Sequence, residues 1–228
     1  MAETVEQVVR DDAGRVLQVA RMRDGLLDGE LTVYAPDGTV RTRAAYRVGK
    51  LDGEVTTHDE DGALLLRAEY RDGERDGDST VYAAGRPQML MRYAAGVLEG
   101  ETLSYGPGGQ VTARLRYRGG KLEGESEWYD VEGRLLRRAT YVADRQEGPT
   151  LEYFASGRVR ERALFRDGVP DGETLVYDEE GRIRERRRFR EGKPVGAPER
   201  FDERGRPEGK PGRLSLLRKT LGTLAGGK

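Results

Sequence analysis

Apolar and polar residues alternate along several stretches of the chain, and this pattern predicts β-strands. In residues 110–117 every second side chain is apolar: Val111, Ala113, Leu115 and Tyr117. Such alternation places one set of side chains on one face of a strand and the other set on the opposite face. The same phase recurs in residues 64–70 and 159–165. We therefore expect an antiparallel sheet with one apolar face.

Glycine recurs with a fixed period that divides the chain into equal units. The members of one series are 24 residues apart, except for one step of 23: Gly14, Gly38, Gly62, Gly85, Gly109, Gly133, Gly157, Gly181 and Gly205. A second series lies eleven residues later, with Asp144 in the one missing place: Gly25, Gly49, Gly73, Gly96, Gly120, Gly168 and Gly192. A third series, four residues further on, is complete: Gly29, Gly53, Gly77, Gly100, Gly124, Gly148, Gly172 and Gly196. Glycine suits tight turns, so each unit is interpreted as a hairpin plus its return turn.

The period predicts an all-β fold, an elongated single-layer antiparallel sheet of about eight 24-residue β-hairpin repeats followed by a short C-terminal amphipathic segment. The expected organisation is an N-terminal cap strand in residues 1–13, repeats in 14–205, a Pro/Gly linker in 206–212 and an amphipathic basic tail in 213–228. A long glycine-containing turn, such as residues 167–172, is expected before each short strand.

Two segments show the repeat most clearly. They are YRGGKLEGE at residues 117–125 and FRDGVPDGE at residues 165–173. This pattern resembles the bacterial variant of the MORN repeat, found in proteins described as antitoxin components of toxin–antitoxin systems. The resemblance covers nearly the whole chain. It implies hairpins stacked edge to edge and a role in protein binding or scaffolding, with a toxin or an assembly component as the partner.

The amino-acid composition excludes several kinds of catalytic and metal sites. The chain has no cysteine, which excludes disulfides, thiol nucleophiles and cysteine-ligated metals. The only histidine, His58, occupies a place that tyrosine fills in other repeats, and we interpret it as a packing aromatic. Carboxylates recur at equivalent places, which favours pairing with arginines over a catalytic pair: Glu30, Glu54, Asp78, Glu101, Glu125 and Glu173. We expect no enzyme activity, no metal ligand and no cofactor.

Charge differs between the two halves of the chain. Residues 1–114 carry 14 Lys+Arg and 20 Asp+Glu, whereas residues 115–228 carry 26 and 21. Both signs are interleaved and no sustained basic patch appears, so nucleic-acid binding is not expected. No secretory signal and no apolar stretch of about 20 residues is present. The sequence predicts a soluble, cytoplasmic protein.

Positions that break the repeat without a structural reason are candidates for binding a partner. Trp128 alternates with Tyr129, so we expect it on the face opposite the tyrosine row. Two interpretations stay open there: an exposed interface anchor, or a ring packed against neighbouring arginine stems. Arg184 and Arg186 belong to a basic stretch, residues 182–188, which is either a solvated end of the array or a docking surface for an acidic partner.

The C-terminal segment provides a second candidate. Four leucines have helical spacing and basic neighbours: Leu214, Leu217, Leu221 and Leu224. Its docking targets are the terminal repeat, a partner groove or an anionic membrane surface, and a protein dock is favoured. The expected function is a non-enzymatic protein-binding repeat module, more narrowly an antitoxin or immunity protein. The alternative is a structural or membrane-peripheral scaffold that uses this tail.

Overall fold

The computed structural model describes residues 3–208, and the regular elements in this range are all β-strands. The chain divides into two compact units, residues 1–147 and residues 148–228, and each is described by itself. Neighbouring strands pair antiparallel in both units. The predicted all-β class, with antiparallel hairpins, is therefore confirmed.

Unit 1 contains β1 (Thr4–Arg10), β2 (Val16–Arg23), β3 (Leu26–Tyr34), β4 (Val40–Arg47), β5 (Lys50–His58), β6 (Leu64–Arg71), β7 (Glu74–Ala83), β8 (Arg86–Ala94), β9 (Val97–Leu98), β10 (Gly100–Tyr105), β11 (Val111–Arg118), β12 (Lys121–Leu122), β13 (Gly124–Tyr129), β14 (Leu135–Val142) and β15 (Arg145–Gln146). Unit 2 contains β16 (Gly148–Tyr153), β17 (Val159–Arg166), β18 (Val169–Tyr177), β19 (Ile183–Arg190), β20 (Lys193–Pro194) and β21 (Glu199–Arg200).

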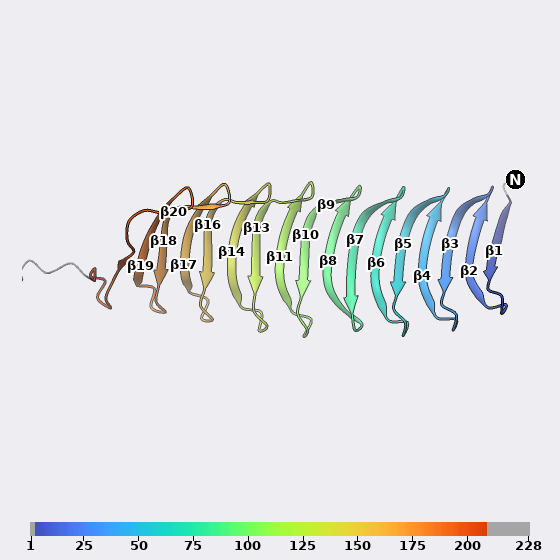
Figure 1. Cartoon of the computed structure of the whole chain (residues 1–228), viewed down its shortest axis with the longest axis horizontal. Helices are drawn as coiled ribbons and strands as arrows, with labels where there is room; N and C mark the ends of the chain where they lie inside the picture. The colour runs from blue at the N-terminus through green and yellow to red at the C-terminus, as the bar shows by residue number, and fades with distance from the viewer. Residues whose placement is uncertain (1–2, 209–228) are drawn as a thin grey trace, which may run out of the picture. The chain divides into compact units, whose positions relative to one another are not determined.

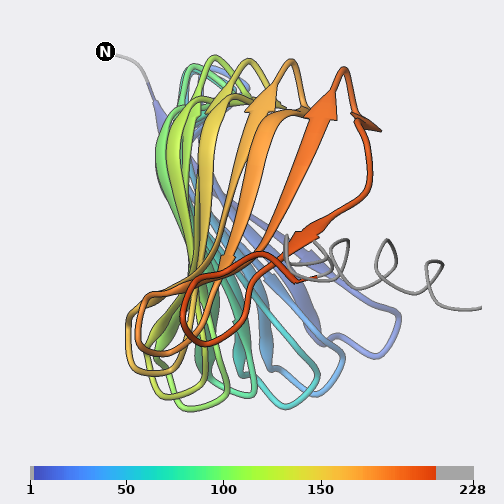
Figure 2. The same ribbon diagram turned by 90° about the vertical axis from the view of Figure 1, so that its left-hand side faces the viewer.

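Strands that follow one another in the sequence are also neighbours in the sheet. In unit 1 the long strands succeed each other hairpin by hairpin, from β1 through β14 (Figure 1). The hairpins of unit 1 rotate gradually along this succession (Figure 2), as expected from the twist of β-strands. The connections are local because each hairpin needs only a turn to reach its neighbour.

The prediction of a long turn at residues 167–172 is wrong. Only Asp167 and Gly168 form the turn, both with positive φ (52° and 84°), and β18 begins at Val169. A register shift follows between Ala163 and Phe165, opposite the third-series glycine Gly172. A two-residue turn with both residues at positive φ matches the twist of the flanking strands, and the remaining glycine accommodates a bulge.

The third glycine series is explained by close contact as well as by φ. At Gly53, φ is 119°, and an added Cβ would lie 2.9 Å from the Cβ of Ala45 on the preceding strand. Across the other neighbouring strand, Gly53 pairs with Tyr70. A larger residue is therefore excluded by both its neighbour and its backbone conformation.

Carboxylates beside these glycines connect successive hairpins. The backbone N–H of Asp72 donates to Asp52 Oδ2 at 3.3 Å, and Arg47 forms an ion pair with the same carboxylate at 2.6 Å. The hydrogen bond from Asp72, followed by the contact with Arg47, lowers the pKa of Asp52. Equivalent acceptors receive a turn N–H from the following hairpin: Asp28, Asp76, Glu99 and Glu123. The recurring acid-glycine pair is thus a connection between repeats.

The buried positions of unit 1 are occupied by small residues. Ala20, Ala68 and Ala139 are fully buried, as are Ser79 and Ser126. Ala68 lies opposite Val55 on one side and Ser79 on the other, so these residues form a row that crosses the strands. Larger side chains flank this row, and the resulting core is thin.

Candidate protein-binding surface

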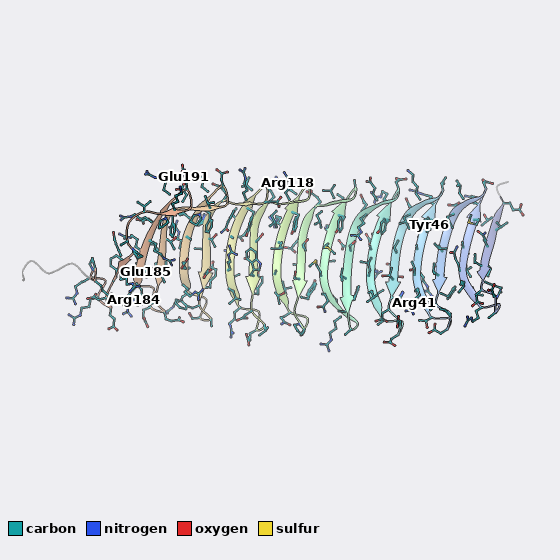
Figure 3. All side chains as sticks on the ribbon, in the orientation of Figure 1. Arg41, Tyr46, Arg118, Arg184, Glu185 and Glu191 are labelled. Carbon is teal, nitrogen blue, oxygen red and sulfur yellow. The ribbon has the colours of Figure 1, made fainter. Side chains whose placement is uncertain are left out.

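Unit 1 has one apolar face, defined by three rows of side chains that cross its strands. The first row runs from partner to partner through Leu66, Val81, Met89, Ser104, Ala113, Trp128 and Arg137. The second row contains the small buried residues, and the third contains Tyr46, Tyr70, Tyr93, Tyr117 and Tyr141. Residues directly opposite one another in antiparallel strands project from the same face. Figure 3 labels Tyr46 near one end of β4 and Arg41 near the other.

This face is apolar, accessible and almost free of charge. Val81 and Met89, which pair across β7 and β8, each keep 37% of their surface exposed. Among the described residues of unit 1, the positions of this face include two arginines, Arg75 and Arg137, and no carboxylate. All strands of this unit belong to the sheet, and no helix or second sheet covers it from within residues 3–147. A contiguous apolar surface of this kind is typical of interaction sites.

Trp128 lies on the apolar face, in the first row, on the side of β13 opposite Tyr129. It pairs with Ala113 of β11 and Arg137 of β14 and is half-buried. The guanidinium carbon of Arg137 lies 4.9 Å from its ring centroid, and the Tyr141 ring meets it edge-on at 6.4 Å. The arginine packing that the sequence left as one alternative is therefore present, and the ring keeps an exposed part. A role in partner binding stays a prediction.

The other partner of Arg137 is an amide. Its Nη2 donates to Gln146 Oε1 at 3.3 Å, and the described residues of unit 1 supply it with no carboxylate within ion-pair distance. Stacking on an aromatic ring offsets some of the hydration that the guanidinium loses, but it provides no counter-charge within unit 1.

Arg75, in the third row, also packs against aromatic side chains. Its guanidinium donates to the hydroxyls of Tyr70 and Tyr93, each at 3.3 Å, and lies 5.2 Å from the Tyr93 ring centroid. The hydrogen bond with Tyr70, the larger effect, and the one with Tyr93 raise the pKa of Arg75. The equivalent residues in neighbouring repeats are Leu51 and Leu98. An arginine thus replaces a leucine on the apolar face.

The opposite face of unit 1, which we call the charged face, contains matched arginines and carboxylates. Arg67 lies 2.5 Å from Glu54, and similar pairs join Arg92 to Asp78, Arg114 to Glu101 and Arg138 to Glu125. These are the recurring carboxylates of the sequence, and their arginine partners follow the expected pattern. Their separation by whole repeats leaves no two of them in unlike environments at one site, as acid–base catalysis requires.

One cluster on the charged face has shifted pKa values. The Tyr129 hydroxyl donates to Glu127, and Arg138 donates to the same carboxylate at 2.7 Å. The hydrogen bond from Tyr129, then that from Arg138, lowers the pKa of Glu127. Burial, then the hydrogen bond to Glu127, raises the pKa of Tyr129 to about 12. The cluster ties neighbouring strands together and contains no nucleophile.

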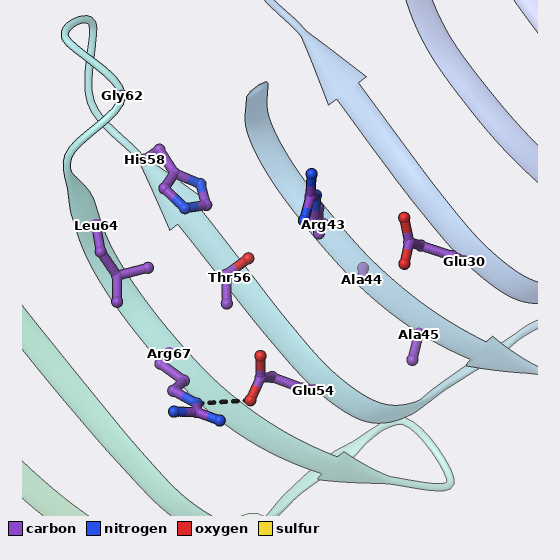
Figure 4. A pocket seen from close by; sticks show the side chains of 10 residues that line it. All are labelled: Glu30, Arg43, Ala44, Ala45, Glu54, Thr56, His58, Gly62, Leu64 and Arg67. Atoms are coloured by element: carbon purple, nitrogen blue, oxygen red, sulfur yellow. Dashed lines mark hydrogen bonds and ion pairs between the residues drawn. The ribbon is translucent and has the colours of Figure 1, made fainter. Parts of the chain in front are cut away.

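His58 lines a hollow of about 570 Å³ on the charged face (Figure 4). It ends β5 and pairs with Leu64, at the position where other repeats have tyrosine. Its Nδ1 is buried without a hydrogen-bond partner, and Glu54 nearby is already held by Arg67. This geometry agrees with a packing aromatic and provides no base oriented toward a nucleophile.

Arg184 and Arg186 lie on β19 of unit 2, and Figure 3 labels Arg184 beside Glu185. Arg186 lies 3.8 Å from Glu173 and 3.5 Å from Glu199, and its guanidinium carbon is 5.6 Å from the Phe201 ring centroid. Arg184 has a buried Nη1 that lacks a hydrogen-bond partner. The charge of Arg186 is thus neutralised inside unit 2, which favours a capping role, and docking of an acidic partner there stays a prediction.

The predicted tail site, Leu214, Leu217, Leu221 and Leu224, lies outside the described residues. Within residues 3–208, no cluster of three or more potential metal ligands occurs. The same range contains no helix long and apolar enough to cross a bilayer.

Sequence reasoning missed Arg75, Arg137 and Tyr141 as members of the site. A signal was present for both arginines, because each replaces an apolar residue of the repeat on the apolar face. Tyr141 follows the repeat pattern, so only the register of β13 with β14 shows that it lies beside Trp128.

Comparisons with known proteins identify no family. No family model and no curated protein matches the chain. Among solved structures, TcdB2-TccC3-TEV is 12% identical with a TM-score of 0.21; the match covers 91% of this chain and 13% of that one. A porin-like protein from Bacteroides uniformis is 11% identical with a TM-score of 0.20, and the match covers 86% of this chain and 93% of that one. TM-scores this low support no argument about fold or function.

Proposed function

We propose that this chain is a non-catalytic protein-binding repeat module and that the apolar face of unit 1 receives the partner. The observation that supports this most is a partly exposed apolar row, from Leu66 to Arg137, with no second layer within the described part of unit 1. Trp128 near one end of that row is the expected energetic centre, because aromatic side chains dominate interface hot spots.

A narrower proposal follows from the resemblance to the bacterial MORN-repeat variant. In that case the chain is an antitoxin or immunity protein, and the partner is a toxin that the apolar face occludes. The membrane-peripheral scaffold is the alternative, and it depends on residues 213–224, outside the described range. The identity of the captured partner separates these proposals.

Affinity capture from native lysate tests the general proposal. The full chain should recover one stoichiometric protein, and Trp128→Ala should reduce the recovery at least about tenfold, as for an interface hot spot. Leu65→Ala is the matched control, because Leu65 is an exposed apolar residue on the charged face of the same unit. Equal capture by wild type and a folded Trp128→Ala variant contradicts the proposal.

A further inference from the structure

We infer that the apolar face of unit 1 binds an acidic amphipathic segment, whose apolar side chains pack on the first row and whose carboxylates meet Arg137 and Arg75. This inference rests on the proposed function, because it names the partner chemistry of the same surface. Its basis is the pattern of charge on that face.

Both arginines stand where folding alone favours an apolar residue. Arg137 takes the first-row place that Ala113, Met89 and Leu66 hold in the three preceding repeats. A half-buried cation that lacks a counter-charge stabilises a sheet less than leucine would, since part of its hydration is lost. On the charged face, by contrast, Arg67 and Arg138 each form an ion pair with a carboxylate. Other arginines on the charged face, such as Arg43 and Arg116, form no ion pair with the described residues but are exposed, so water hydrates their charge. Arg137 instead combines partial burial with the lack of an ion pair within the described part of unit 1.

Charge complementarity indicates which kind of molecule binds the apolar face. A second copy docked through the same face would bring Arg75 and Arg137 toward like charges, which is unfavourable. The chain's own C-terminal segment, residues 209–228, is equally unsuitable because it contains five basic residues and no carboxylate: Lys210, Arg213, Arg218, Lys219 and Lys228. A partner segment with carboxylates fits, since the planar guanidinium donates to a carboxylate through two parallel hydrogen bonds.

The spacing of the two arginines sets the length of this segment. Arg75 is on β7 and Arg137 on β14, and the intervening long strands are β8, β10, β11 and β13. Five strand spacings correspond to roughly 24 Å across the sheet, and the step from the first row to the third, four residues along a strand, adds about 13 Å in the perpendicular direction. An α-helix that lies diagonally across the face needs about 18 residues to cover the resulting distance of about 27 Å, so one amphipathic helix can reach both arginines.

Two synthetic helical peptides test the inference. They share one pattern of leucines, and their polar positions are all glutamate in one and all lysine in the other. Trp128 is the only tryptophan of the chain, so a change in its emission reports binding of either peptide. We expect saturable binding of the glutamate peptide, weaker at high salt, and no saturable binding of the lysine peptide.

Variants of the full chain test whether the two arginines cause the preference for the glutamate peptide. Arg137→Gln and Arg75→Gln should each weaken glutamate-peptide binding by about threefold to fivefold, and the double variant by about tenfold or more. Arg116→Gln is the matched control, because Arg116 is an exposed arginine on the charged face, opposite Glu101 in the strand register. Ser104→Glu and Ser104→Arg, in the first row, leave both arginines in place and should weaken and strengthen binding respectively.

Several outcomes overturn the inference. They are equal binding of the two peptides, no saturable binding of the glutamate peptide, and unchanged affinity in the folded double variant. If Trp128-dependent capture from lysate succeeds while the glutamate peptide fails, the proposed function stands and the acidic partner is wrong. If capture also fails to depend on Trp128, the apolar face itself is not the binding surface.

Discussion

Small side chains determine how each hairpin of unit 1 packs. Ala68 and Ala139 are fully buried on the apolar face, between larger residues in the first and third rows. Ser79 and Ser126 occupy equivalent places, and their hydroxyls are buried without hydrogen-bond partners. A buried hydroxyl that lacks a partner costs about 1–3 kcal/mol relative to a satisfied one. Ser79 and Ser126 therefore lower the free energy of unfolding of unit 1, whose core is already thin.

The Glu127–Tyr129 pair predicts a loss of stability at both extremes of pH. Tyr129 is protonated more tightly in the folded state, so its contribution is complete below pH 10 and is lost as the pH rises through about 12. Glu127 has a lowered pKa, so its contribution is present above its usual pKa of 4.5 and is lost as the pH falls through the lowered value. Thermal melts across pH should show both effects in wild type and weaken both in Tyr129→Phe. Identical pH profiles for the two proteins would refute the coupling.

Whole hairpins are the units of stability in this fold. Each long strand of unit 1 pairs with its neighbours in the sequence, and each hairpin turn bonds to the hairpin before it, as Gly73 N–H does to Leu51 O at 2.8 Å. Stability in such an array is approximately a sum over repeats and nearest-neighbour interfaces. Removing one complete repeat preserves the alternation of strand direction, whereas removing half of one reverses it.

Two deletions test this dependence on complete repeats. Deleting residues 38–61 removes one period and joins Asp37 directly to Gly62, which restores an Asp-Gly pair. Deleting residues 38–49 removes β4 and its turn alone, so the following strand points in the wrong direction for antiparallel pairing. We expect the half-repeat deletion to lose at least about 3 kcal/mol more unfolding free energy than the full one, because several backbone hydrogen bonds at about 1 kcal/mol each are broken. Denaturant unfolding measures the difference. Equal stability of the two deletion variants would show that stability does not depend on complete repeats.

For the molecule as a whole, sequence periodicity was sufficient for the all-β class because strand alternation and turn chemistry are local. It failed at residues 167–172, where six apparent turn residues are a two-residue turn and a bulge. It also missed the contact of Trp128 with Tyr141 and the isolation of Arg75 from carboxylates, because both depend on cross-strand register. Register follows from the bulges, whose positions a glycine pattern alone does not fix.

The same register predicts that a partner binds the apolar face and not the charged face. Ser104 and Leu103 are consecutive on β10 and project to opposite faces, since Ser104 pairs with Ala113 and Leu103 with Arg114. Replacing each in turn with a photo-crosslinking amino acid and irradiating native lysate compares the two faces within one strand. We predict a specific protein adduct from position 104 and none from position 103. An adduct at 103 alone, or equal adducts at both positions, would contradict the claim.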